Sequence, residues 1–200
     1  QKASVRSVLE KQLLARPVRF DRLRQLFYFI QKSGGLRWLQ KLNQLGKNKL
    51  FKFIVQLPLV KFPYAGTVDG MHASGNHWRE IYPAEGKKRG EVGLFLGCVA
   101  RITDVATLNS SIYVLNRLGY TVHVPADQTC CGALYQHSGA LQQAASLAQQ
   151  NKSVFSGLKV NTVISTASGC GVQLLESGVA DEHSQIIDIS RFLTAAEGWE

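Results

Sequence analysis

The pattern of hydrophobic and polar residues changes near residue 92, and the two sides of that point predict different structures. Beyond it, short apolar runs alternate with longer stretches of helical spacing. The apolar runs predict strands over 92–98, 121–125, 161–171 and 185–190. The helical spacing predicts helices over 105–115, 141–155, 171–177 and 191–197. Strands that alternate with helices predict an α/β fold with a small, mainly parallel sheet and helices on both faces.

Before residue 61 the pattern is that of short amphipathic helices, with apolar residues on one face and Lys or Arg opposite. Their expected ranges are 5–13, 21–30, 36–42 and 50–57. Residues 61–91 show no sustained period and contain five glycines and two prolines, which predicts an extended linker. The sequence thus divides into a helical basic extension at 1–60, an extended linker at 61–91 and an α/β domain at 92–200.

The composition is that of a globular protein, with 45% hydrophobic and 18% charged residues in a chain of 200. No apolar run approaches the roughly 18 residues of a transmembrane helix. The first residues, QKASVRSVLEKQ, contain neither an apolar signal-peptide core nor a starting methionine, so we expect a piece of a longer cytoplasmic polypeptide. Reduced thiols in that compartment favour metal or redox chemistry over a disulfide framework.

The net charge of +9 is divided unevenly along the chain. Residues 1–90 contain 18 Lys and Arg against 5 Asp and Glu, whereas residues 91–200 contain 5 against 9. A basic segment can bind nucleic acid, an anionic membrane surface or an acidic partner, or can simply be solvated. Because few of its basic residues alternate with aromatic ones, no nucleic-acid partner is predicted. The other three interpretations stay open, including peripheral attachment to the inner, anionic face of a cytoplasmic membrane.

All four cysteines lie in the acidic part of the chain, near the ends of predicted strands. Cys98 ends the first strand, Cys130 and Cys131 follow the second, and Cys170 ends the third. Because the carboxyl ends of parallel strands share one edge of a sheet, we expect four sulfurs at one rim. Four thiolates are the usual ligands of an iron–sulfur cluster or of structural zinc. The alternative is that they are small buried residues following hydrophobic strands.

Three further residues are candidates for the same site. Gly132 and Gly171 adjoin cysteines and would let the backbone approach a cluster closely. His137, six residues after Cys131, could donate a hydrogen bond to a thiolate or supply a ligand. The alternative for His137 is a histidine at a helix start that is satisfied by the backbone. No catalytic residue is predicted, because Gly-x-Ser-x-Gly and Gly-x-Gly-x-x-Gly are both absent.

Four segments together resemble a known family. They read GLFLGCVAR at 93–101, LNRLGYTVHVPADQTCCGALYQHSG at 115–139, LAQQNKSVF at 147–155 and VISTASGCGVQLLESG at 163–178. With these residues and spacings, residues 92–195 are similar to the CCG, or cysteine-rich, domain. That domain occurs in the iron–sulfur subunit of bacterial glycolate oxidase, in the lactate-utilisation iron–sulfur protein and in the B subunit of heterodisulfide reductase. The family's final Cys-x-x-Cys pair is reduced here, because Gln173 stands at its second cysteine.

The resemblance implies an iron–sulfur electron-transfer subunit of a glycolate oxidase-like 2-hydroxyacid dehydrogenase, with no substrate turnover of its own. It implies that a [4Fe–4S] cluster, which an isolated fragment can lack, is held by Cys98, Cys130, Cys131 and Cys170. Flavin-containing dehydrogenase subunits would supply the electrons, and a quinone pool would receive them. The alternative is structural: a four-thiolate zinc site, or a metal-free cysteine-rich domain that docks the flavin subunits.

Overall fold

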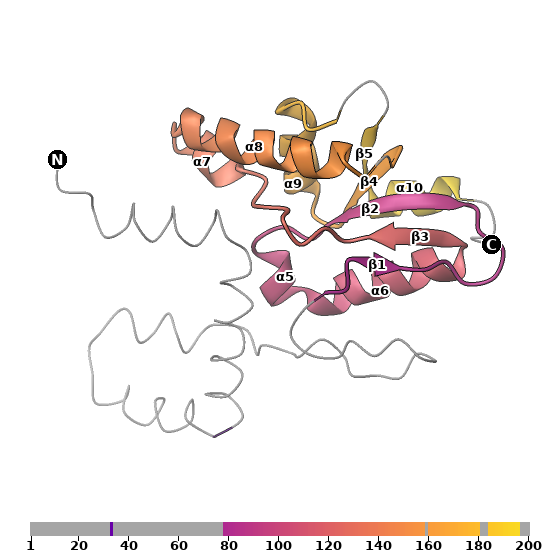
Figure 1. Cartoon of the computed structure of the whole chain (residues 1–200). Coiled ribbons are helices and arrows are strands. Elements are labelled where there is room, and N and C mark those ends of the chain that lie inside the picture. The colour runs from indigo at the N-terminus through magenta and orange to yellow at the C-terminus, as the bar shows by residue number, and fades with distance from the viewer. Residues whose placement is uncertain (1–32, 34–77, 159, 181–183, 197–200) are drawn as a thin grey trace.

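The computed structural model describes residues 33, 78–158, 160–180 and 184–196 (Figure 1). The helices predicted within residues 1–60 and most of the predicted linker lie outside these residues. Apart from Ser33, the described residues form one α/β unit built on one sheet. Within that unit, none of the helices combines the length and the apolar character needed to span a membrane.

Five strands make up the sheet of the described unit: β1 (Ile81–Tyr82), β2 (Gly90–Phe95), β3 (Tyr120–His123), β4 (Thr162–Ser165) and β5 (Gln185–Asp188). Their order across the sheet is β1-β3-β2-β4-β5. Strands β2 to β5 run parallel, and β1 pairs with β3 in the antiparallel sense. The structure therefore confirms the predicted mainly parallel sheet. β1 comes from the segment that was expected to be linker, and it adds an edge strand.

Helices cover both faces of this sheet, as the sequence predicts. The described helices are α5 (Ala100–Thr103), α6 (Val105–Arg117), α7 (Ala133–His137), α8 (Leu141–Ser156), α9 (Ser168–Glu176) and α10 (Ile189–Ala195). Figure 1 shows α7, α8 and α9 on one face of the strands and α5 and α6 on the other. Phe192 of α10 packs into the same core as α6.

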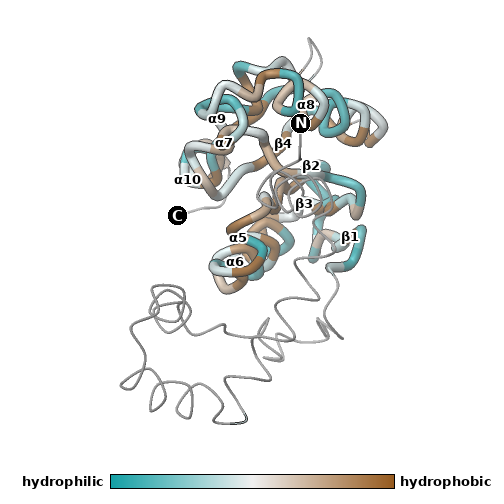
Figure 2. Tube along the Cα trace, turned by 90° about the vertical axis from the view of Figure 1, so that its left-hand side faces the viewer, coloured by the Kyte–Doolittle hydropathy of each residue, from teal (hydrophilic) through white to brown (hydrophobic). Residues whose placement is uncertain are grey.

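Alternate strand residues supply the two cores between these layers. Leu94 of β2 packs with Leu108 of α6 on one face, and both side chains are fully buried. Phe95 points to the other face, where its ring lies 6.3 Å from that of Phe155 in α8. Burying an apolar side chain of this size contributes roughly 1.5–3 kcal/mol. Figure 2 views the layers from the side, with α8 and α6 on opposite sides of the strands.

The third predicted strand, over 161–171, is too long. β4 ends at Ser165, and α9 begins at Ser168. The intervening residues and those that follow are small and carry no hydrophobic period, so the sequence does not mark this boundary. As a result Cys170 lies in the first turn of α9, and not at the end of a strand.

Two further differences concern helix boundaries. The predicted strand over 185–190 ends at Asp188, whose carboxylate accepts a hydrogen bond from the backbone N–H of Ser190 at 2.9 Å and so caps α10. Helix α7 is absent from the sequence prediction. His137, for which a helix start was the alternative interpretation, is the last residue of this helix.

Candidate metal centre

The cysteines gather where the sheet changes winding direction. Helices α5 and α6 follow β2 on one face, whereas α9 follows β4 on the other, although β2 and β4 are neighbours. The loops that leave these two strands therefore diverge, and such a point at the carboxyl ends of parallel strands is where α/β folds bind ligands. Cys98 follows β2, and Cys170 follows β4. The loop after β3 brings Cys130 and Cys131 to the same place.

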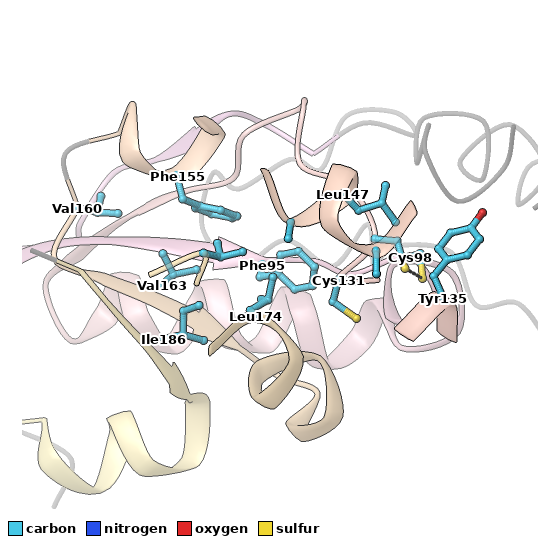
Figure 3. Close-up of a cluster of buried hydrophobic side chains, with 14 residues drawn as sticks. Phe95, Cys98, Cys131, Tyr135, Leu147, Phe155, Val160, Val163, Leu174 and Ile186 are labelled. Atoms are coloured by element: carbon cyan, nitrogen blue, oxygen red, sulfur yellow. Dashed lines mark hydrogen bonds between the residues drawn. The ribbon is translucent and has the colours of Figure 1, made fainter. Parts of the chain in front are cut away.

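The structure brings the four sulfurs together as two pairs. Cys98 Sγ lies 3.1 Å from Cys130 Sγ, and Cys131 Sγ lies 3.4 Å from Cys170 Sγ. All four are free cysteines; three are buried, and Cys170 is partly exposed. Figure 3 shows Cys98 and Cys131 at one end of the apolar layer that extends from Val160 to Tyr135. The two adjacent cysteines thus reach different partners on different elements.

The turn after the adjacent cysteines directs backbone amides at the sulfurs. Gly132 has a φ of 88°, a left-handed conformation that favours glycine, and it is the N-cap residue directly before α7. Its N–H donates to Cys130 Sγ at 3.5 Å. After the larger effect of the Cys130 and Cys170 thiols, the N–H groups of Ala133 and Cys131 also lower the pKa of the Cys131 thiol. The chain therefore presents several backbone N–H donors to the sulfurs. Such donors stabilise the thiolate form.

The four thiols differ in the direction in which their pKa values are shifted. Hydrogen bonds from Cys130 first and Cys170 second lower the pKa of Cys131 to about 3. A hydrogen bond from Cys130 is also the main cause that lowers the pKa of Cys98. Hydrogen bonding to Cys131 is the main cause that raises the pKa of both Cys130 and Cys170. The two thiols with a lowered pKa, Cys98 and Cys131, thus belong to different contact pairs, and binding of a metal would release protons from the set.

The chemistry of this donor set fits a metal that prefers sulfur. Thiolates select zinc and iron–sulfur clusters over hard cations. The spacing, however, is that of contacting thiols. A tetrahedral zinc site with Zn–S distances of about 2.3 Å needs sulfurs about 3.8 Å apart, so both pairs would have to separate on binding. In agreement, no three described His, Cys, Asp or Glu side chains form a ready metal-binding group.

The other predicted site residues differ in how close they come to the sulfurs. Gly132 forms the turn beside Cys130. Gly171 instead faces β4, because a Cβ added there would lie 3.6 Å from the Ser165 Cβ. His137 is exposed at the end of α7, and none of the hydrogen bonds identified among the described residues joins its ring to a cysteine. Gln173 is buried one turn after Cys170 and lines a cavity of about 480 Å³ between α8 and α9.

Two buried amides beside the cysteines are absent from the sequence prediction. Gln128 precedes the cysteine pair by two residues, and Asn151 lies on α8; their side chains are 1% and 0% exposed. Asn151 shares a helical stripe with Leu147, Ala148 and Phe155, which are all buried. A polar residue within an apolar stripe is the sequence signal that could have identified it, because buried polar groups need partners. Gln128 has no comparable signal in the sequence.

The part of the chain that contains all four cysteines is similar to known proteins. Residues 92–175 match the CCG family, which is described as a cysteine-rich domain. The chain is 36% identical over 100 residues to "Probable glycolate oxidase iron-sulfur subunit" of Bacillus subtilis. These residues are 50% of this chain and 22% of that protein. It is 32% identical over 108 residues to the B subunit of "Fumarate reductase (CoM/CoB)" of Methanothermobacter marburgensis, with 51% and 21% covered.

A third relative is shorter. "Lactate utilization protein A" of Oceanobacillus iheyensis is 33% identical over 86 residues, which are 43% of this chain and 34% of that protein. The matched part therefore spans between about a fifth and a third of the length of these relatives. No solved structure gives a significant match to the chain.

Proposed function

We propose that residues 92–175, which match the CCG family, form a cysteine-rich domain of that family, and that the chain is an iron–sulfur electron-transfer segment of a glycolate oxidase-like 2-hydroxyacid dehydrogenase. The observation that carries the proposal is that four free cysteines from three separate segments meet in two contact pairs at one rim. Relatives named as an oxidase iron–sulfur subunit and as part of a reductase support electron transfer as the class of function.

In this proposal the four cysteines are ligands and not nucleophiles. They would hold a [4Fe–4S] cluster, which supplies one-electron transfer when bound: Cys98, Cys130, Cys131 and Cys170. Gly132 would donate its N–H to a ligand sulfur, as it does to Cys130 in the structure. Gly171 packs toward β4 and His137 faces solvent, so the proposal gives neither of them a direct contact with the cluster. It also gives the chain no substrate turnover of its own.

The proposed partners follow from the direction of electron flow. Flavin-containing dehydrogenase subunits would oxidise the 2-hydroxy acid and reduce this segment, which would pass electrons toward a quinone. A cytoplasmic protein that reduces a membrane quinone must come close to the bilayer. The excess of Lys and Arg in residues 1–90 would favour peripheral contact with anionic lipid or with an acidic partner.

One observation favours a second candidate, a structural zinc site. The two sulfur–sulfur distances of 3.1 and 3.4 Å fall only slightly short of the spacing of about 3.8 Å around one tetrahedral zinc ion, so a small separation of each pair would suit zinc. A zinc-bound or metal-free domain of this kind would hold subunits together without carrying electrons.

Metal analysis separates these functions. After anaerobic reconstitution with iron and sulfide, the proposal expects roughly four irons and four acid-labile sulfides per chain. Visible absorption should bleach on reduction with dithionite. Cys130→Ser and Cys131→Ser should each abolish the absorption, because a hard hydroxyl replaces a soft thiolate.

Ala133→Ser is the matched control, since it introduces the same hydroxymethyl group into the same turn without removing a thiol. It should retain the wild-type iron content. A wild-type chain that takes up zinc but no iron would favour the structural function. Full iron content in both cysteine variants would refute the ligand assignment.

A further inference from the structure

The loop that carries the adjacent cysteines is tied to the sheet by Gln128. The side-chain oxygen of this buried amide accepts a hydrogen bond from the Leu96 N–H at 2.7 Å. Its side-chain nitrogen donates to the Leu94 carbonyl at 3.2 Å and to the Pro125 carbonyl at 3.1 Å. Leu96 is two residues before Cys98. One side chain therefore fixes the exit of β2 relative to the loop after β3, which are the two segments that supply the Cys98–Cys130 pair.

The same loop is tied to helix α8 by Asn151. Its side-chain oxygen accepts a hydrogen bond from the Thr129 N–H at 2.8 Å, and its side-chain nitrogen donates to the Cys130 carbonyl at 3.0 Å. These two backbone groups flank Cys130. Holding both of them sets the rotation of the backbone through Cys130, which decides the directions in which the side chains of Cys130 and Cys131 leave the loop.

We propose that Gln128 and Asn151 are positioning residues for the cysteine ligands. They direct Cys130 to Cys98 and Cys131 to Cys170. The inference rests on the proposed function for its consequence, namely that this pairing presents four sulfurs to one cluster. An amide suits both positions because it offers a donor and an acceptor in one planar group. A carboxylate would keep only the acceptor, and an aliphatic side chain would keep neither.

The other interpretation of these residues is that they only stabilise the core. Asn116 provides a control that separates a positioning role from stabilisation of the core. It is likewise fully buried, and its amide donates to the Tyr82 carbonyl at 3.1 Å and to the Tyr120 carbonyl at 2.9 Å. Tyr120 is the first residue of β3, at the end of the strand opposite to the cysteine loop. Asn116→Leu therefore removes an equally buried amide from the same fold without touching the cysteine segments.

The first experiment compares Gln128→Leu, Asn151→Leu and Asn116→Leu in the full chain after anaerobic reconstitution. Loss of a residue that orients metal ligands typically weakens metal binding by about 10- to 100-fold. We expect a change of that size in iron retention against a chelator for the Gln128 and Asn151 variants, and an altered electron paramagnetic resonance spectrum after reduction. Asn116→Leu should show the wild-type spectrum and retention, even when its unfolding midpoint falls equally. Wild-type spectra and retention in both loop variants would overturn the proposal.

The second experiment uses the metal-free chain, so that it stands apart from the proposed function. Reduced protein is treated with dibromobimane, which bridges two nearby thiols, and the bridged peptides are identified by mass spectrometry. The wild type should give Cys98–Cys130 and Cys131–Cys170 bridges, as the sulfur contacts indicate. Asn151→Leu and Gln128→Leu should lose this preference roughly tenfold, and Asn116→Leu should keep it.

Gln128→Glu and Asn151→Asp cover the case in which the leucine variants do not fold. Each keeps the side-chain volume and the acceptor, and it loses the donor to Leu94 or to Cys130 respectively. They should give intermediate bridging. Unchanged bridging in folded forms of these variants would refute the positioning role. A wild type that binds no iron yet shows the expected bridging would refute the cluster and leave the positioning role standing.

Discussion

At the scale of single residues, the adjacent cysteines are the least ordinary feature of the chain. Consecutive Cα atoms lie about 3.8 Å apart, whereas a disulfide requires about 4.4–6.8 Å. Cys130 and Cys131 are therefore poorly placed to bond to each other. Each has a sulfur from another segment within 3.4 Å instead. The adjacency places two sulfurs at one point of the fold, where they interact with each other, and brings each beside a different partner sulfur.

This pairing predicts how the metal-free chain oxidises. With oxidised glutathione as the oxidant, we expect disulfides Cys98–Cys130 and Cys131–Cys170, because thiol–disulfide exchange proceeds between sulfurs that can touch. Peptide mapping by mass spectrometry under non-reducing conditions measures the pairing. In Cys98→Ser the Cys131–Cys170 bond should persist and Cys130 should remain a free thiol. A predominant Cys130–Cys131 disulfide would contradict the geometry of the site.

At the scale of elements, the turn between the cysteine loop and α7 depends on one glycine. Gly132 has a φ of 88°, and a Cβ added there would lie 3.4 Å from the Cα and the carbonyl oxygen of Ala144 in α8. Gly139 has a similar φ of 77° but no heavy atom within 4 Å of its added Cβ. An alanine would have an unfavourable backbone conformation at either position. Only at Gly132 would its Cβ also contact helix α8.

Replacing each glycine by alanine separates the effect of the Gly132 turn on the metal ligands from the effect of backbone strain on stability. Both variants should lower the free energy of unfolding by about 1–2 kcal/mol, because alanine is strained in the left-handed conformation. Only Gly132→Ala should also reduce iron content, since its turn carries the Cys130 and Cys131 sulfurs. Denaturant unfolding and iron analysis measure the two effects. Equal iron content in both variants would show that the turn does not set the ligand geometry.

The sequence predicts the elements that have a strong period and misses the others. Helices α6 and α8 carry long apolar stripes and appear where expected, whereas strand β2 is found but begins two residues before and ends three residues before the predicted 92–98. β1 has two residues and α7 has five, too few for a period to show. The small residues before Cys170 favour neither strand nor helix, so tertiary packing sets the boundary there.

The candidate site, too, could be predicted from the sequence only in part. The carboxyl ends of parallel strands share one edge of a sheet, so the gathering of the four cysteines at one rim follows from the sequence. The choice of partner for each sulfur depends on hydrogen bonds between residues far apart in the chain. Gln128 reaches back 32 residues to Leu96, and Asn151 reaches back 22 residues to Thr129. No local pattern encodes such contacts.

At the scale of the whole molecule, the charge division makes a prediction about surfaces. Residues 1–90 carry a net charge of +13, and residues 91–200 carry −4. If the basic segment contacts lipid through exposed charges, binding to vesicles that contain phosphatidylserine should weaken steeply as salt rises, because such charges are screened within about 8–10 Å. Vesicle sedimentation across a salt series measures this.

Neutral phosphatidylcholine vesicles provide the lipid control. Lys47→Glu combined with Lys49→Glu should weaken binding to the anionic vesicles, and Lys47→Gln combined with Lys49→Gln should weaken it less. Binding that is insensitive to salt would indicate that apolar contact dominates, and no binding at all would leave an acidic protein partner as the proposed role of the segment.

The direction of β1 connects this segment to the cysteine rim. Ile81 pairs with His123 and Tyr82 with Val122, so the chain enters the sheet at the carboxyl end of β3. The carbonyl of Glu80 accepts a hydrogen bond from the Val124 N–H at 2.8 Å, four residues before Gln128. A partner captured by residues that precede β1 would consequently be attached to the domain at the edge of the sheet where the sulfurs lie. Its effective concentration at that rim exceeds its concentration in solution, so a weak encounter with the site can be frequent without any tight interface there.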